Sequence, residues 1–432
     1  MSKLSALDAG VEMTTLPCGI RIVTHAMPHL QSATLGVWVG SGTRNEAADQ
    51  NGISHLLEHM AFKGTMTRSA RQIAEEIESV GGEINAATGH EATAYFARVL
   101  RPDVGLGLEL IADMLRNPRF EDAELDLERE VILQEIAASR DQPEEVVCEQ
   151  ADEVAYPGQA VGRPILGDPA NIRSLDADDL RRHMAVHYTC GNLVVSAAGA
   201  VDHARLVRHA EALFAGFNPA TAPAAEAASF RGGTRVQARR FEQTHLLLGY
   251  ESPSIRDPRY IGVQILAAVL GGGASSRLFQ KVREERGLCY AIDASASGYM
   301  DTGLLAIQAA TSRKLLEELM QVTGLELVSI MDEGPSMAEV ERAKAQLKAG
   351  LLMSLESSGA RAEQLARQTL VHGRPLGLAD LAAKVDSVTV SSVRELARSL
   401  LSAERHVWSE VGPKADGKAG ERLAARLQHV LH

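Results

Sequence analysis

Three side chains within five positions have the types and spacing of a metal site. His55 and His59 stand four residues apart, and Glu58 precedes the second of them in the run His-Leu-Leu-Glu-His. On a helix, positions i and i+4 share one face, so both imidazoles can reach a single ion. The Glu58 carboxylate then lies close enough to polarise a water molecule at that ion.

This cluster has two interpretations when it is considered alone. The order H-x-x-E-H is a zinc-peptidase motif, the inverse of the commoner H-E-x-x-H. However, five-residue patterns with three fixed positions also occur by chance, and a His-Glu-His group can form a solvated helix face. A third ligand elsewhere in the chain would favour the metal site.

A distant glutamate could supply that ligand, because catalytic zinc usually takes three protein ligands and keeps one position open. The helix predicted over 122–139 offers Glu128 and Glu135, which are seven residues apart and share a face. Two glutamates on one helix are more often surface residues than ligands. Glu135, however, lies in the largely apolar run 131–136, and a carboxylate buried there needs an ion or another partner.

The elements that must position these residues can be placed from local patterns. A strand is expected over 33–39, where apolar and β-favouring residues run into the turn Gly40-Ser41-Gly42. Elsewhere in the first half we expect helices over 53–62, 69–80, 102–115, 122–139 and 203–214, and strands over 92–100 and 193–198. In the second half we expect strands over 245–250 and 290–297, and helices over 259–270, 312–331, 337–356 and 390–401.

The second half repeats the plan of the first, which predicts an α+β fold with two related domains. The stretch 218–229 is low in complexity and contains two prolines, as is typical of a linker. The predicted organisation is an N-terminal catalytic domain over 1–217, a linker over 218–234 and a C-terminal domain without zinc over 235–432.

Three stretches resemble the M16 family of metallopeptidases, or inverzincins, which contains the mitochondrial processing peptidase, insulin-degrading enzyme and pitrilysin. They read GISHLLEHMAFKGT at 52–65, EREVILQEI at 128–136 and GRPILG at 162–167. The separation of 76 positions from His59 to Glu135 also matches the family. Over nearly its whole length the chain looks like the M16B subfamily of the processing-peptidase β subunit and its bacterial relatives.

The resemblance implies one zinc ion per chain, held by His55, His59 and Glu135, with Glu58 as general base. Glu128 matches a second acidic position of the family and would orient a ligand histidine. An ordinary surface glutamate is the alternative for that position. The second half has no His-Glu-His group on its corresponding helix, so a single catalytic centre is expected.

Substrate-facing residues are implied in both halves. The stretch 81–88 resembles the family's edge strand beside the zinc, with Asn85 and Ala86 near the scissile bond. Such an edge can bind an extended peptide as an added strand. In the second half, REERGLCY resembles the segment where the family keeps an arginine and a tyrosine seven apart. Arg283 would hold a substrate carbonyl, and Tyr290 would stabilise the tetrahedral intermediate.

The fold implied by the resemblance is the LuxS/MPP-like metallohydrolase fold, in which each domain is a mostly antiparallel sheet flanked by helices. One chain would form half of a clamshell chamber, and it would pair with an identical chain or with a related M16 subunit. The implied activity is that of a zinc endopeptidase for extended or unfolded peptides. The competing hypothesis is a non-catalytic structural or partner subunit, although such subunits usually lack parts of the zinc constellation.

Composition limits the remaining partners. The formal net charge of −12 argues against nucleic acid, since phosphate binding needs a basic surface. No run of about 18 apolar residues occurs, so no membrane span is expected. The first ten residues show no secretory signal, and the four cysteines form no C-x-x-C pair. A cytoplasmic protein with reduced thiols is therefore expected.

Overall fold

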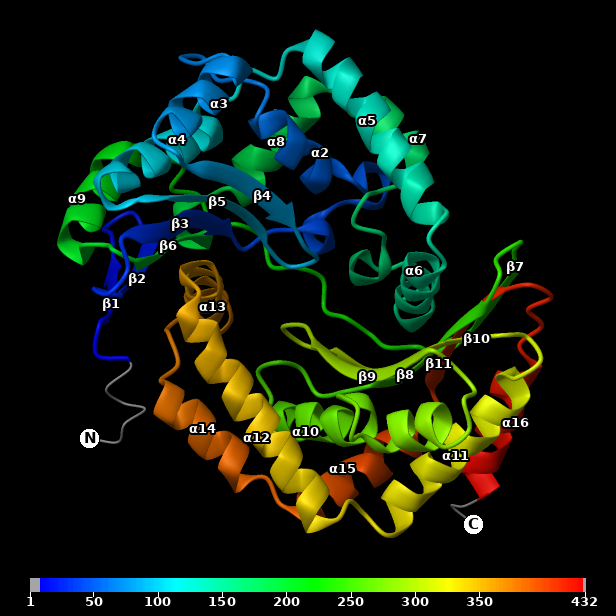
Figure 1. Cartoon of the computed structure of the whole chain (residues 1–432). Coiled ribbons are helices and arrows are strands. Elements are labelled where there is room, and N and C mark those ends of the chain that lie inside the picture. Colours follow the sequence, from blue (N-terminus) through cyan, green and yellow to red (C-terminus); the bar gives the residue numbers. More distant parts are fainter. Residues whose placement is uncertain (1–7, 430–432) are drawn as a thin grey trace. The chain divides into compact units, whose positions relative to one another are not determined.

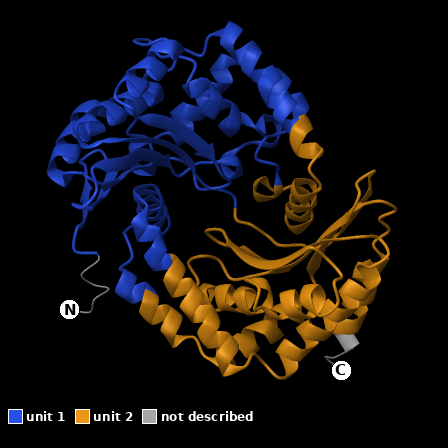
Figure 2. Cartoon of the chain, in the orientation of Figure 1, with its two compact units in different colours: residues 1–136, 163–226, 351–381 blue, residues 137–162, 227–350, 382–432 orange. Residues whose placement is uncertain are grey.

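The computed structural model describes residues 8–429, and its helices and strands are labelled in Figure 1. Contacts divide the chain into two compact units, which Figure 2 colours separately. Unit 1 consists of Met1–Ile136, Arg163–Glu226 and Leu351–Leu381. Unit 2 consists of Ala137–Gly162, Ala227–Gly350 and Ala382–His432.

Unit 1 is built on a six-stranded sheet with the order β1-β2-β6-β3-β5-β4. Its strands are β1 (Val11–Thr15), β2 (Arg21–Ala26), β3 (Ser32–Val39), β4 (Glu83–Thr88), β5 (Thr93–Leu100) and β6 (Leu193–Gly199). Only the β2–β6 pair is parallel, and all other neighbours are antiparallel. Among the described strands β4 pairs with β5 alone, so it forms one edge of the sheet.

Helices cover both faces of this sheet. They are α2 (Ile53–Ala61), α3 (Ala70–Ser79), α4 (Val104–Arg116), α5 (Asp122–Arg140), α7 (Pro169–Ser174), α8 (Ala177–His187), α9 (His203–Leu213) and α13 (Ser358–His372). Leu35 and Val37 point into a core shared with α2, α4 and α9. On the opposite face Trp38 packs with Ala362 and Leu365 of α13. Strand alternation therefore gives β3 two buried faces.

Unit 2 has a five-stranded sheet in the order β7-β11-β8-β10-β9. Its strands are β7 (Gly233–Ala238), β8 (Thr244–Glu251), β9 (Ala291–Gly298), β10 (Gly303–Thr311) and β11 (His406–Gly412). The helices that bury one face include α10 (Tyr260–Gly271), α11 (Leu316–Asp332), α15 (Val390–Leu401) and α16 (Lys418–His429). The remaining helices named in the second half are α12 (Met337–Met353) and α14 (Leu378–Ser387). The other face of the sheet packs against α6 (Pro143–Ala155).

The two sheets share one topology, which confirms the α+β fold with two related domains. The strands β2-β6-β3-β5-β4 of unit 1 correspond in order to β7-β11-β8-β10-β9 of unit 2. In each series the first pair is parallel and the following pairs are antiparallel. The two units thus share their strand order and their pattern of parallel and antiparallel pairing, as the repeat in the sequence predicted.

Each unit takes one helix from the other half of the sequence. Helix α6 precedes the expected linker at 218–234 but packs on β8 and β11 of unit 2, and α13 follows that linker but packs on β3 and β6 of unit 1. The apolar side chains Val146 and Val147 of α6 bury against that sheet. The compact units are therefore discontinuous in sequence, which differs from the continuous domains predicted over 1–217 and 235–432.

No helix within residues 8–429 combines the length and the apolar character needed to cross a lipid bilayer.

A buried cation fastens α13 to its unit. Arg361 is fully buried, and its guanidinium donates to Asp8 Oδ1 at 2.7 Å and to His25 Nδ1 at 2.9 Å. The second carboxylate oxygen of Asp8 accepts from the backbone N–H of Leu378 at 2.6 Å. The arginine thus connects a strand, a helix and the start of the described chain through one set of charge-assisted hydrogen bonds.

We expect Arg361→Met to lower the free energy of unfolding of unit 1 by about 3 kcal/mol, because removing one partner leaves a largely buried carboxylate without its counter-charge. Chemical denaturation followed by circular dichroism measures this change. The matched control is Arg367→Met on the same helix, whose pair with Glu363 is exposed and should matter little. Equal stability of the two variants would contradict the role given to Arg361.

Candidate metal centre

The helix α2 presents its polar residues on one side because its other side is part of the core. Ile53, Leu56 and Leu57 are buried and pack in the main cluster of unit 1. Packing these side chains inward fixes the rotation of the helix. His55 and His59 therefore share the opposite side, with ring centroids 4.6 Å apart at an angle of 70°.

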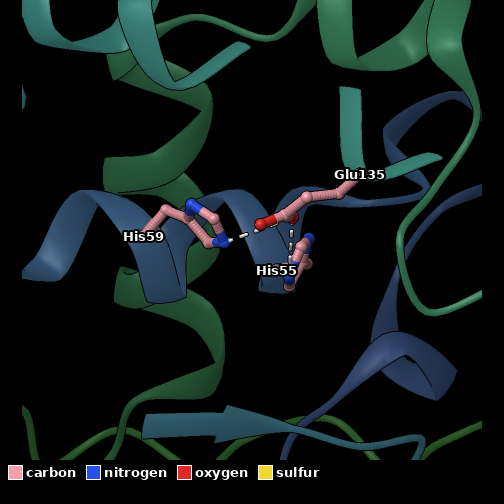
Figure 3. A group of neighbouring side chains, drawn as sticks. All are labelled: His55, His59 and Glu135. Carbon is pink, nitrogen blue, oxygen red and sulfur yellow. Dashed lines mark ion pairs between the residues drawn. The ribbon is translucent and has the colours of Figure 1, made fainter. Parts of the chain in front are cut away.

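The long helix α5 brings a carboxylate to the same place. Its residues Ile132 and Ile136 are buried in the core, so the neighbouring Glu135 faces α2. The Glu135 Oε2 atom lies 3.8 Å from His55 Nε2 and 3.6 Å from His59 Nε2. Figure 3 shows the three side chains pointing toward one another from the two helices.

The three side chains fit the first shell of a divalent metal. Their ligand atoms all lie within 4.8 Å of one another, and within residues 8–429 no other group of three or more His, Cys, Asp or Glu side chains meets that condition. Nitrogen and oxygen ligands about 2.0–2.2 Å from a tetrahedral zinc stand roughly 3.4 Å apart. The observed separations of 3.6 and 3.8 Å are close to that value. Two imidazoles and one carboxylate also form a known catalytic ligand set.

Glu128 contacts the second histidine through a hydrogen bond. Its Oε2 atom lies 2.8 Å from His59 Nδ1, and its Oε1 atom lies 2.6 Å from Lys63 Nζ. When Nδ1 carries the proton, the lone pair of Nε2 faces the site. Burial opposes ionisation of Glu128, but the hydrogen bonds from Lys63 and His59 lower its pKa overall. Lys63 was not singled out from the sequence, although it lies within the stretch that resembles the family.

The protonation of His55 also suits a ligand. Burial and the neighbouring His59 lower the pKa of His55 to about 4, so its ring is neutral at pH 7. A neutral imidazole has a lone pair to offer. The Nδ1 atom of His55 is buried, and no hydrogen-bond partner for it lies within the described residues. The two histidines therefore differ, since the protein fixes the tautomer of His59 alone.

The carboxylate of Glu58 is held by the edge strand. Burial raises the pKa of Glu58, while a hydrogen bond from Thr88 at 2.6 Å to its Oε2 atom acts in the opposite direction. A raised pKa brings a carboxylate nearer to neutral pH, where a proton acceptor is most effective. Thr88 was missed by the sequence analysis because a lone threonine in a strand carries no signal of its own.

The same strand contains the two residues expected beside a substrate. Asn85 is exposed and Ala86 is buried, and both lie on β4. The side-chain oxygen of Asn85 accepts from the backbone N–H of Ala86 at 2.8 Å. Thr88, the last residue of β4, donates a hydrogen bond to Glu58, so this end of the edge strand lies next to the candidate base.

Arg283 and Tyr290 lie in unit 2, whereas the candidate metal centre lies in unit 1. Arg283 occupies a π-helix over Phe279–Glu284, a rare form that often marks functional segments. Its guanidinium carbon lies 4.5 Å from the centre of the Phe279 ring and 5.1 Å from that of Tyr290. Tyr290 itself is 78% exposed. The two expected residues therefore form one stacked pair.

Comparison with known proteins shows that the chain belongs to peptidase family M16. The family model described as insulinase (peptidase family M16) matches residues 21–169, and the model of the peptidase M16 inactive domain matches residues 174–347. The two matches together span most of the sequence. They confirm the family resemblance of the zinc-ligand stretches.

Several bacterial proteins are similar along almost their full length. A protein of Streptomyces coelicolor named as a zinc protease is 38% identical over 95% of this chain and 91% of its own. A protein of Rickettsia felis named as a zinc protease is 37% identical over 90% of this chain and 95% of its own. One of Bacillus subtilis with the same description is 34% identical over 91% of this chain and 96% of its own.

Solved structures show the same fold at lower identity. A peptidase M16 inactive domain from Pseudomonas fluorescens has a TM-score of 0.86 at 20% identity and covers 94% of this chain and 98% of its own. A chain of Complex III2 from Candida albicans has a TM-score of 0.84 at 22% identity, covering 97% of this chain and 100% of its own.

We expect Glu128→Gln to weaken zinc binding about tenfold, because the neutral amide holds the proton of His59 less firmly and leaves Lys63 without its counter-charge. Calorimetric titration of the metal-free protein with zinc measures the affinity. Glu130→Gln, an exposed position on the same helix, is the control and should bind zinc as the wild type does. Identical affinities for both variants would show that Glu128 has no part in the site.

Proposed function

We propose that this chain is a zinc-dependent endopeptidase whose metal is held by His55, His59 and Glu135. The convergence of two histidine Nε2 atoms on one oxygen of Glu135 carries the proposal. Membership of a peptidase family supports it, as do relatives at 34–38% identity that are named zinc proteases. One zinc ion per chain follows, since the described residues offer a single such group.

The proposed chemistry is hydrolysis of a peptide bond. A zinc ion bound here would lower the pKa of water and polarise the substrate carbonyl. Glu58 would take a proton from the attacking water and pass it to the leaving amine. Thr88 would keep the receiving carboxylate oriented, because its hydroxyl already donates to Glu58 Oε2.

The edge of β4 is the proposed binding place for the substrate backbone. An extended peptide can continue the sheet there, which suits unfolded or short chains. Asn85 and Ala86 would lie near the scissile bond, and the Asn85 side chain would release the Ala86 N–H that it now covers. Arg283 and Tyr290 would complete the site, with Arg283 on a substrate carbonyl and Tyr290 on the developing oxyanion.

We further propose an assembly in which each chain forms half of a chamber, as a homodimer or with a related M16 subunit. The same fold occurs in a chain of Complex III2 of Candida albicans. That likeness also supports the alternative, a non-catalytic structural or partner subunit. The complete set of ligands and base in unit 1 favours the enzyme.

The four cysteines are free thiols, which supports a cytoplasmic location.

We expect Glu58→Gln to keep its zinc and to lose peptidase activity by at least a hundredfold, because the amide cannot accept the proton. Metal analysis and cleavage of a quenched fluorescent peptide measure the two effects. Glu135→Gln is the contrasting variant and should lose both metal and activity. If Glu58→Gln cleaves the peptide at the wild-type rate, Glu58 is not the base.

We expect Tyr290→Phe to lower kcat by about a hundredfold with little effect on KM, because the hydroxyl would act on the oxyanion that forms only in the transition state. Steady-state kinetics with the same peptide separate the two constants. Tyr299→Phe, a tyrosine elsewhere in unit 2, is the control. An unchanged kcat in Tyr290→Phe would remove this residue from the catalytic step.

A further inference from the structure

The first turn of the metal-bearing helix has no cap of its own. Helix α2 follows Gly52, which has a φ of 103° and no side chain to accept from the first backbone N–H groups. Those groups have no partner within the helix and need one elsewhere. Glu46 supplies it, since its Oε2 accepts from the N–H of Gly52 and its Oε1 from the N–H of Ser54, both at 2.8 Å.

Glu46 is a buried carboxylate whose side chain accepts hydrogen bonds from residues at and just before this turn. It is 5% exposed, and Asn51 also donates to its Oε2 atom at 2.9 Å. Burial of an anion is costly unless hydrogen bonds and opposite charge compensate it. The N-terminal end of a helix carries partial positive charge, so α2 and this carboxylate stabilise each other.

A second segment fixes Glu46 and the start of the helix from the other side. Arg163 donates to the backbone oxygen of Glu46 at 2.8 Å, and Asn51 donates to the carbonyl of Pro164 at 3.1 Å. Gly167 lies against Gly52 so closely that an added Cβ would come within 2.5 Å of the Gly52 Cα. The stretch GRPILG at 162–167, which has no part in the proposed reaction, thus packs against the start of α2 and supports its first turn.

This anchor lies immediately before a metal ligand. His55 is the third residue of α2 and directly follows Ser54, whose N–H Glu46 holds. A change in the first turn would therefore move His55 relative to His59 and Glu135. Small displacements matter, because a shift of about 1 Å in a catalytic group can cost a hundredfold in rate.

We propose that Glu46 is a positioning residue, which fixes the rotation of the first turn of α2 so that His55 and His59 meet Glu135 around one zinc ion. This inference rests on the proposed function, since it assigns Glu46 a role at that zinc site. A residue of merely structural value would lower stability when changed, but would leave the zinc affinity of the folded protein as it was.

The test compares Glu46→Gln and Glu46→Asp with the wild type by chelator competition for zinc, below the unfolding temperature of each protein. We expect both variants to bind zinc about tenfold more weakly, with a lower kcat and an unchanged KM. The aspartate keeps the negative charge but is too short to accept from both N–H groups. Weaker zinc binding in Glu46→Asp would therefore show that the position of the carboxylate matters and not its charge alone.

Asp113→Asn is the matched control. Asp113 is another buried carboxylate of unit 1 and accepts from Thr65, Thr67 and Arg68, away from the first turn of α2. This control should lose thermal stability while it keeps the zinc affinity of the wild type. Weaker zinc binding in Asp113→Asn equal to that of the Glu46 variants would overturn the proposal, because any loss of packing would then have the same effect.

The remaining outcomes are also decisive. Wild-type zinc affinity in folded Glu46→Gln, or in Glu46→Asp alone, overturns a positioning role. If neither variant folds, Asn51→Ala removes one donor and should weaken zinc binding to a smaller extent; an unchanged affinity there overturns the proposal. If the wild type binds zinc but cleaves no peptide, the proposed function fails, while the affinities still decide the role of Glu46.

Discussion

The proposed function depends on one convergence, in which three side chains from two helices lie close enough to bind a single ion. The two separations of 3.6 and 3.8 Å require α2 and α5 to be fixed in rotation and in height. The core provides that fixation, because both helices bury their apolar residues in the same cluster. The geometry of this candidate site is therefore a property of the packing of unit 1 as much as of the three side chains.

Three carboxylates lie around α2, and each has a different environment. Glu46 is buried at the first turn and accepts from backbone N–H groups. Glu128 is buried between Lys63 and His59, whose hydrogen bonds lower its pKa. Glu58 has one hydroxyl partner and a pKa raised by burial, as a proton acceptor requires. These different environments fit the three different roles that we propose for the carboxylates.

Much of this site could be predicted, because its signals are local. The i, i+4 spacing of His55 and His59 defines a helix face. The apolar run around Glu135 predicted a buried carboxylate, but this side chain is 42% exposed, because Ile132 and Ile136 occupy the buried side of the helix. The contacts of Glu46, Thr88 and Lys63 could not be predicted, since each depends on a partner brought near by folding. The repeat of the sheet was predicted, but strands β1, β2, β7, β10 and β11 were not placed from the sequence. The exchange of α6 and α13 between the units was not predicted either. An amphipathic pattern shows that a helix has an apolar side but not which sheet will cover it.

The most direct measurement is anomalous diffraction at the zinc edge from crystals of the zinc-loaded protein. We predict one strong peak per chain, about 2.0–2.2 Å from His55 Nε2, His59 Nε2 and a carboxylate oxygen of Glu135. A peak at any other set of side chains, or none at this place in a protein that holds zinc, would contradict the central claim.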